Sequence, residues 1–244
     1  ALPIWVGRAL KNGMERKVRP RIITEFEPGK YFAHGSLEEA VVYTEGILCC
    51  LPAVLRSIAA GADGMDYSPP HLADLARGEP GAIRNFRGYW RDFREAVAQR
   101  QMPGGINVHA DVRRCCFNLN TDALLCRLQE QGADPQALGQ LGELFRFWSA
   151  CGCQGLPLGH PSRILLKFFL HPVDRELAAA GVPSLRMVDD FRLLCRTTGE
   201  GREALAVLQE KLGGVGLQLS TAKTVFQRVG SRSDGLRQLS QAWK

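Results

Sequence analysis

The stretch that decides the fold is Leu185-Arg-Met-Val-Asp-Asp-Phe-Arg-Leu-Leu194, in which two apolar runs flank the acidic pair Asp189-Asp190. Short apolar runs separated by a polar pair predict a β-hairpin with the acids at its tip. Adjacent carboxylates repel each other, so acids at such a turn suggest that their charge is used, most often to bind divalent cations through oxygen ligands. Because one Asp-Asp pair can arise by chance in a chain of this length, the surrounding sequence must decide its meaning.

A third aspartate lies near the end of the run Ile106-Asn-Val-His-Ala-Asp111-Val112. This run predicts a strand that ends at Asp111, and a helical pattern begins at Thr121, the expected N-cap. One acid at a strand end and two at a hairpin tip could meet at one edge of an antiparallel sheet. Nucleotidyl transfer needs such acids, because they hold two Mg²⁺ ions about 3.5–4 Å apart.

A Gly/Pro-rich turn that starts at Gln154 leads into an amphipathic helix, for which Ser162 is the expected N-cap. Gly155 and Gly159 lack side chains, so the backbone there can pass close to a flat ligand such as a base. Farther along, the segment 216–226 predicts a strand, a polar turn that contains Lys223, and a second short strand. The loop is therefore a candidate platform for a nucleotide or template.

Four segments, taken in order, resemble motifs A to D of reverse transcriptases. They are Asp111-Val-Arg-Arg-Cys-Cys-Phe-Asn-Leu119, Gly155-Leu-Pro-Leu-Gly159 with Ser162-Arg163, Met187-Val-Asp-Asp190, and Leu217-Gln-Leu-Ser-Thr-Ala-Lys-Thr224. The Ser-Arg pair and the segment Leu170-His-Pro-Val-Asp174 most resemble the prokaryotic abortive-infection and unknown-group enzymes. The resemblance therefore implies an RNA-directed DNA polymerase. Because many members of those groups serve in anti-phage defence, it also implies a role in bacterial defence.

The resemblance also implies roles for individual residues. Asp111 and Asp189 would be catalytic Mg²⁺ ligands, helped by the backbone carbonyl of Val112, and Asp190 would complete the acidic cluster. Mn²⁺ could replace Mg²⁺. Lys223 would face the triphosphate and neutralise or protonate the departing pyrophosphate.

The basic segment Lys11–Ile23 resembles the fingers hairpin of the same family. Arg19 and Arg21 are the residues expected to grip the incoming triphosphate, because guanidinium groups pair well with phosphate oxygens. Gly159, in the second motif, is the expected backbone contact for the nucleotide.

Three positions depart from the family pattern. Met187 stands where the third motif usually opens with an aromatic residue, and Leu158 stands where retroviral enzymes have glutamine. Cys116 replaces the aromatic residue that normally closes the space beside the sugar 2′ position. Unless Phe117 fills that space, the exchange predicts weaker exclusion of ribonucleotides.

Composition agrees with a polyphosphate partner. The chain has 31 Lys and Arg against 25 Asp and Glu, a net charge of +6. The implied partners are a nucleic acid template and primer, dNTPs, and a non-coding RNA or accessory protein. We recognise no run of about 18 apolar residues and no signal peptide, which predicts a soluble cytoplasmic chain without a membrane partner.

Two further features have competing interpretations. The segment Phe86-Arg-Gly-Tyr-Trp-Arg-Asp-Phe93 could stack on single-stranded bases, but the helical spacing of its aromatics favours a core stripe. The eight cysteines include no Cys-x-x-Cys pair, which favours reduced structural thiols over a zinc site.

The predicted fold class is α+β, a right-hand polymerase palm: a ferredoxin-like antiparallel sheet backed by helices, with fingers and a largely absent thumb. The expected domains are residues 1–103 as fingers, with a basic hairpin at 16–27 and helices at 36–60 and 84–100; 104–229 as palm; and 230–244 as the start of a thumb or a linker. The expected palm order is strand, helix, long helix, hairpin, helix and strand. A non-templated or protein-primed polymerase on the same palm and a catalytically inactive nucleic-acid-binding subunit remain alternatives.

Overall fold

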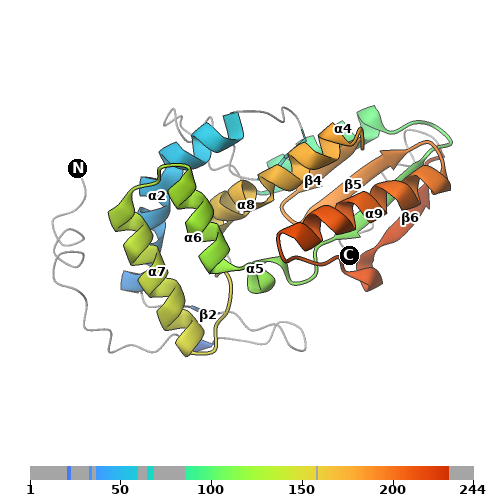
Figure 1. Ribbon diagram of the computed structural model, residues 1–244. Coiled ribbons are helices and arrows are strands. Elements are labelled where there is room, and N and C mark those ends of the chain that lie inside the picture. Colours follow the sequence, from blue (N-terminus) through green and yellow to red (C-terminus); the bar gives the residue numbers. More distant parts are fainter. Residues whose placement is uncertain are drawn as a thin grey trace. The chain divides into compact units, whose positions relative to one another are not determined.

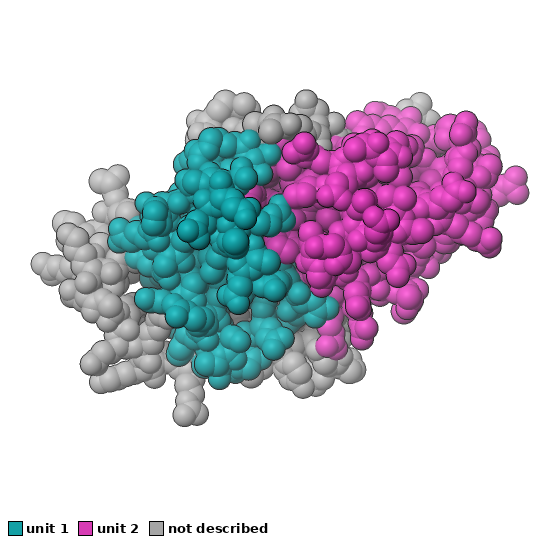
Figure 2. All heavy atoms as spheres, in the orientation of Figure 1, with its two compact units in different colours: residues 1–57, 116–165 teal, residues 58–115, 166–244 magenta. Residues whose placement is uncertain are grey.

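The computed structural model describes residues 21–22, 33–34, 37–59, 65–68, 86–157 and 159–230. The chain is α+β and divides into two compact units, residues 1–57 with 116–165 and residues 58–115 with 166–244 (Figure 2). Each unit contains two separate stretches of chain, so this division differs from the expected succession of 1–103, 104–229 and 230–244. Neither unit is a single continuous segment, because the chain passes from one unit to the other three times.

The described part of the first unit is mainly helical. Its elements are α2 (Leu37–Ala59), which ends just beyond the unit, α5 (Cys115–Asn118), α6 (Thr121–Glu130), α7 (Pro135–Ala150) and the short pair β1 (Arg21–Ile22) and β2 (Ala33–His34). The pairing of β1 with β2 takes the second strand beyond the expected hairpin at 16–27, most of which lies outside the described residues. The helix expected at 36–60 is confirmed, whereas α7 was not expected.

Two helix starts differ from the prediction. The N-cap of α6 is Asn120 and not Thr121: the Asn120 side chain accepts a hydrogen bond from the Ala123 N–H at 3.0 Å. Helix α8 (His160–Ala179) begins two residues before Ser162. Pro161 favours the first helical turn, where its missing N–H costs nothing, and Ser162 instead shares a buried 2.8 Å hydrogen bond with the Tyr43 hydroxyl.

Within α2, the stretch Glu39–Ile58 is long and apolar enough to cross a membrane by length and composition alone, so the expectation that no such stretch exists is wrong. Its buried apolar residues recur at spacings of three and four, which is also the pattern of a core helix in a soluble protein. They are Val42, Tyr43, Ile47, Cys50, Ala53 and Val54.

The second unit contains a four-stranded antiparallel sheet in the order β4-β5-β3-β6 (Figure 1). The strands are β3 (Ile106–Asp111), β4 (Ser184–Met187), β5 (Asp190–Cys195) and β6 (Val225–Arg228). The predicted hairpin is confirmed as β4, a two-residue turn and β5, and the predicted strand that ends at Asp111 is confirmed as β3. This arrangement brings the end of β3 beside the start of β5.

Helices cover both faces of this sheet. On one face, Gly201 of α9 (Thr198–Gly214) packs against Val108 and Phe226, and α8 reaches the side chain of Arg186. On the other face, α4 (Phe86–Arg100) contributes a core cluster with Leu185, Met187 and Leu194. In α4, Tyr89 and Phe93 are fully buried, so the core interpretation of that aromatic stripe is confirmed.

Candidate active site

The expected acids lie at one end of the sheet in the second unit. Asp111, the last residue of β3, is paired directly with Asp190, the first residue of β5. The Val112 N–H donates to the Asp189 carbonyl at 3.1 Å, which ties the end of β3 to the β4–β5 turn. Since paired residues of antiparallel strands lie about 5 Å apart, the Cα atoms of Asp111 and Asp189 are within about 10 Å of each other.

Lys223 joins this group from a separate segment. Its ammonium nitrogen lies 3.4 Å from each carboxylate oxygen of Asp111. The short helix η1 (Thr221–Lys223) is held to the strand end, because the Ser220 N–H donates to the Asp111 carbonyl at 2.7 Å. The Lys223 side chain is 57% exposed, so this ion pair is weak and the ammonium stays accessible to another anion.

Burial disfavours the ionised forms of both Asp111 and Asp189. Burial, and then the charge of Asp111, raise the pKa of Asp189 to about 6. Burial also raises the pKa of Asp111, against the opposing effect of Lys223. Two carboxylates whose ionised forms are disfavoured in this way suit a divalent cation, which would stabilise both charges.

Asp190 has two basic neighbours in addition to the other acids. Its Oδ1 lies 3.1 Å from His109 Nε2 and 3.2 Å from Arg192 Nε, and the Arg192 side chain is 1% exposed. Among the residues that the structure describes, no group of three or more His, Cys, Asp or Glu side chains could hold a metal ion. Metal binding by Asp111, Asp189 and Asp190 therefore stays a prediction, and the Asp190 carboxylate is also paired with a buried cation, Arg192.

The sequence contained a signal for this arrangement. Side chains two residues apart on a strand share a face, so His109 lies on the face of Asp111, and Arg192 on the face of Asp190. Pairing of the two strands then places His109 diagonally beside Asp190. The pairing of β3 with β5, which long-range contacts determine, was the missing information.

Three expected nucleotide-binding residues, Cys116, Phe117 and Gly159, belong to the first unit. Gly155 has φ +72°, and a methyl group on it would overlap the carbonyl oxygen of Cys116. The Leu156 N–H donates to that same carbonyl at 2.7 Å, so the loop before α8 packs directly on the backbone of Cys116. The side chains of Cys116 and Phe117 are partly exposed, and Gly159 is exposed. Contact of these residues with a nucleotide stays a prediction.

Two expected phosphate ligands cannot be placed. Arg19 lies outside the described residues, and of Arg21 only the backbone, in β1, is described. Their role in gripping a triphosphate stays a prediction.

No protein-family model matches the chain, and no curated protein matches it. Among solved structures, the chain is similar to a telomerase from Candida albicans in complex with a TWJ fragment of telomeric RNA, with 14% sequence identity and a TM-score of 0.44. The match covers 78% of this chain and 34% of the telomerase chain, so the chain spans about a third of that protein. A likeness of this degree is distant and says nothing about catalysis or substrate.

Proposed function

We propose that this chain contains the palm of a reverse transcriptase and carries out nucleotidyl transfer as an RNA-directed DNA polymerase. The observation that supports the proposal is the pairing of Asp111 with Asp190, which places Asp111 next to Asp189 in the β4–β5 turn. Lys223 lies on the same carboxylate from a third segment. Three of the four sequence motifs that resemble one enzyme family thus supply the acids and the lysine at one strand end.

The two carboxylates have the properties of cation ligands. Asp111 and Asp189, with the backbone carbonyl of Val112, would hold Mg²⁺ or Mn²⁺. When bound, such an ion activates the attacking hydroxyl and neutralises the triphosphate. Asp190 would not be needed as a direct ligand, because His109 and Arg192 already surround its carboxylate. Its charge would instead fix the orientation of those side chains beside the site.

Lys223 would act on the leaving group. Its ammonium is exposed and its ion pair with Asp111 is weak, so it can turn to a phosphate oxygen. An ammonium next to the β- and γ-phosphates stabilises the developing charge of pyrophosphate and can donate a proton to it.

The finer parts of the proposal come from the resemblance of the motifs. They are the prokaryotic abortive-infection type, a role in anti-phage defence, a template and primer as partners, and a cytoplasmic location. Non-templated synthesis on the same palm would use the same acids. Sequencing the products made with and without added template separates these two modes.

The test is metal-dependent nucleotide incorporation by the full chain. Wild type, Asp111→Asn and Asp189→Asn are compared on an RNA template, on a DNA template and without template, in Mg²⁺. We expect each variant to lose more activity than the roughly 10- to 100-fold that follows loss of an outer-shell partner of a metal site. Glu203→Gln, which removes an exposed carboxylate from α9, is the matched control and should match wild type.

Two outcomes would contradict the proposal. One is incorporation by Asp189→Asn at the wild-type rate, and the other is a wild-type protein that incorporates no nucleotide under any of the three template conditions. The second outcome would favour an inactive nucleic-acid-binding subunit.

A further inference from the structure

The turn that carries Asp189 has an unfavourable backbone conformation. Val188 and Asp189 form the two-residue turn between β4 and β5, and Val188 has φ +63°. A positive φ is rare for a β-branched residue, because its Cβ crowds the backbone, and glycine is the usual residue there. Such strain costs on the order of 1–3 kcal/mol and persists only where the surrounding structure enforces it.

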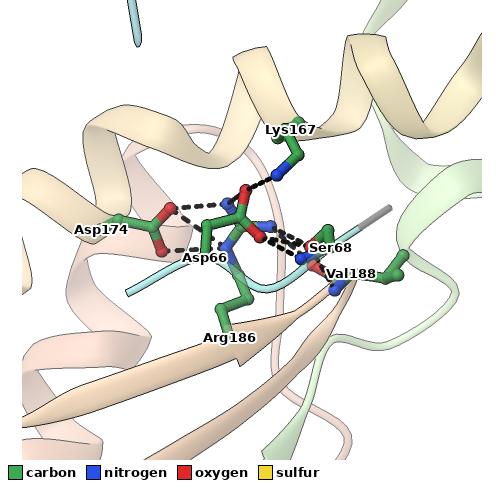
Figure 3. Close-up of polar contacts among 6 residues, drawn as sticks. All are labelled: Asp66, Ser68, Lys167, Asp174, Arg186 and Val188. Carbon is green, nitrogen blue, oxygen red and sulfur yellow. Dashed lines mark hydrogen bonds and ion pairs between the residues drawn. The ribbon is translucent and has the colours of Figure 1, made fainter. Parts of the chain in front are cut away.

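Two side chains hold both polar backbone groups of Val188. The Val188 N–H donates to the Ser68 hydroxyl at 2.6 Å, and the Val188 carbonyl accepts from the Arg186 guanidinium at 2.9 Å (Figure 3). The peptide groups on either side of the strained residue are thus fixed in direction. Neither bond belongs to the β ladder, so the sheet alone does not impose this conformation.

Ser68 is itself held firmly. Its hydroxyl donates to the Asp66 carboxylate and accepts from both Val188 and Arg186, which uses its single proton and both lone pairs. The segment 65–68 also lies along β4, with hydrogen bonds from the Tyr67 N–H to the Arg186 carbonyl and from the Arg186 N–H to the Met65 carbonyl. The hydroxyl therefore occupies a fixed position next to the turn.

Arg186 is held by two carboxylates in a buried ion network. Its guanidinium lies 2.6 Å from Asp174 of α8 and 2.9 Å from Asp66, and Lys167 of α8 lies 3.0 Å from Asp66 (Figure 3). The network contains two cations and two anions. Burial alone would lower the pKa of Arg186, but Asp174 and Asp66 outweigh burial and raise it, so the cation is permanent.

Stability alone gives no reason for this network. A buried ion network is often no more stabilising than well-packed apolar residues, because desolvation offsets its attraction. Its members come from segment 65–68, helix α8 and strand β4. Two of their hydrogen bonds are made to the backbone of Val188, the strained residue that precedes Asp189. What the network adds is a fixed conformation at the turn.

We infer that Ser68, Arg186 and Asp174 are positioning residues that hold Val188 in its left-handed conformation and thereby aim the Asp189 carboxylate at the end of β3. This inference rests on the proposed function of Asp111 and Asp189 as cation ligands. It assigns a role to the segment 65–68, which belongs to none of the four motifs.

The test uses Ser68→Ala in the full chain, because this change removes one hydroxyl and leaves all four charges. Two readouts need no catalysis. One is Mn²⁺ affinity, measured by electron paramagnetic resonance, and the other is the rate of hydrogen exchange of the Val188 amide. We expect a roughly tenfold weaker Mn²⁺ affinity and faster exchange. Ser184→Ala, a buried serine of β4 away from the turn, is the matched control and should change neither readout.

A second variant separates positioning from simple loss of stability. Adding Val188→Gly to Ser68→Ala should restore part of the Mn²⁺ affinity, because glycine adopts a positive φ at little cost. If the network only stabilised the fold, Ser68→Ala would lower the melting temperature and leave the Mn²⁺ affinity unchanged, and Val188→Gly would lower the melting temperature further. An unchanged Mn²⁺ affinity in Ser68→Ala would overturn the inference, and so would a further drop in melting temperature on adding Val188→Gly.

The failure of the proposed function would look different. Wild-type protein that binds no Mn²⁺ would overturn the assignment of Asp111 and Asp189 as cation ligands. Hydrogen exchange would still decide whether Ser68 holds the turn, because unchanged exchange of the Val188 amide in Ser68→Ala would show that it does not.

Discussion

The buried carboxylate of Asp189 is costly to the fold when it is ionised. Its pKa of about 6 lies above the ordinary value of 3.8, so the folded protein binds a proton at this carboxylate more tightly than the unfolded chain does. Above pH 6 the group is ionised in both states, and its charge then destabilises the folded protein. As pH falls through 6 towards 4, this penalty disappears.

The sign of that effect gives a prediction for metal-free protein. At pH 8 with EDTA present, Asp189→Asn should be more stable than wild type by on the order of 1–3 kcal/mol, and the two should converge near pH 4. Denaturant unfolding of both proteins across this pH range measures the difference. Saturating Mg²⁺ should reverse the order, because an ion bound only by the folded wild type stabilises it. An Asp189→Asn variant less stable than wild type at pH 8 without metal would contradict the prediction.

At the scale of elements, local pattern and long-range pairing contributed different parts of the site. The apolar runs on either side of Asp189 predicted the hairpin, and the β-branched run predicted a strand that ends at Asp111, because both signals lie within a few residues. The contacts of Arg186 with Ser68 link residues 118 positions apart. No local pattern marks such a pair, so the contacts of segment 65–68 appeared only in the folded structure.

Helix α7 was missed for a related reason. Its buried residues follow helical spacing, but two glycines inside it weaken the helical signal, and the helix forms because it packs within the first unit. Gly46 of α2 shows how close this packing is, since a methyl group there would lie 3.0 Å from the Leu141 side chain. Tertiary contacts thus overrode a weak local preference.

The loop before α8 yields a prediction at this scale. Gly155→Ala should destabilise the protein by about 2–4 kcal/mol, because the new methyl group would meet the Cys116 backbone and the residue needs φ +72°. Gly139→Ala in α7 is the matched control. Space is open around Gly139, so alanine there should stabilise the helix by up to about 1 kcal/mol. Thermal unfolding of both variants measures the two opposite signs, and equal stability of Gly155→Ala and wild type would contradict the close approach.

At the scale of the whole molecule, the expected site residues fall into two units. Asp111, Asp189 and Lys223 belong to residues 58–115 and 166–244, and Cys116, Phe117 and Gly155 belong to residues 1–57 and 116–165. The boundary falls between Cys115 and Cys116, inside the motif that begins at Asp111. The first motif therefore supplies residues to each of the two units.

Sugar selection tests the predicted role of Cys116. If Cys116 lies beside the 2′ position of a bound nucleotide, its small thiol leaves room for a 2′-hydroxyl. Cys116→Phe should then reduce GTP incorporation roughly tenfold or more relative to dGTP, because a phenyl ring fills that space. Single-nucleotide incorporation by wild type and Cys116→Phe measures the ratio, and Cys126→Phe, at an exposed cysteine of α6, controls for the added ring. An equally strong preference for dGTP in wild type and Cys116→Phe would show that Cys116 does not select the sugar.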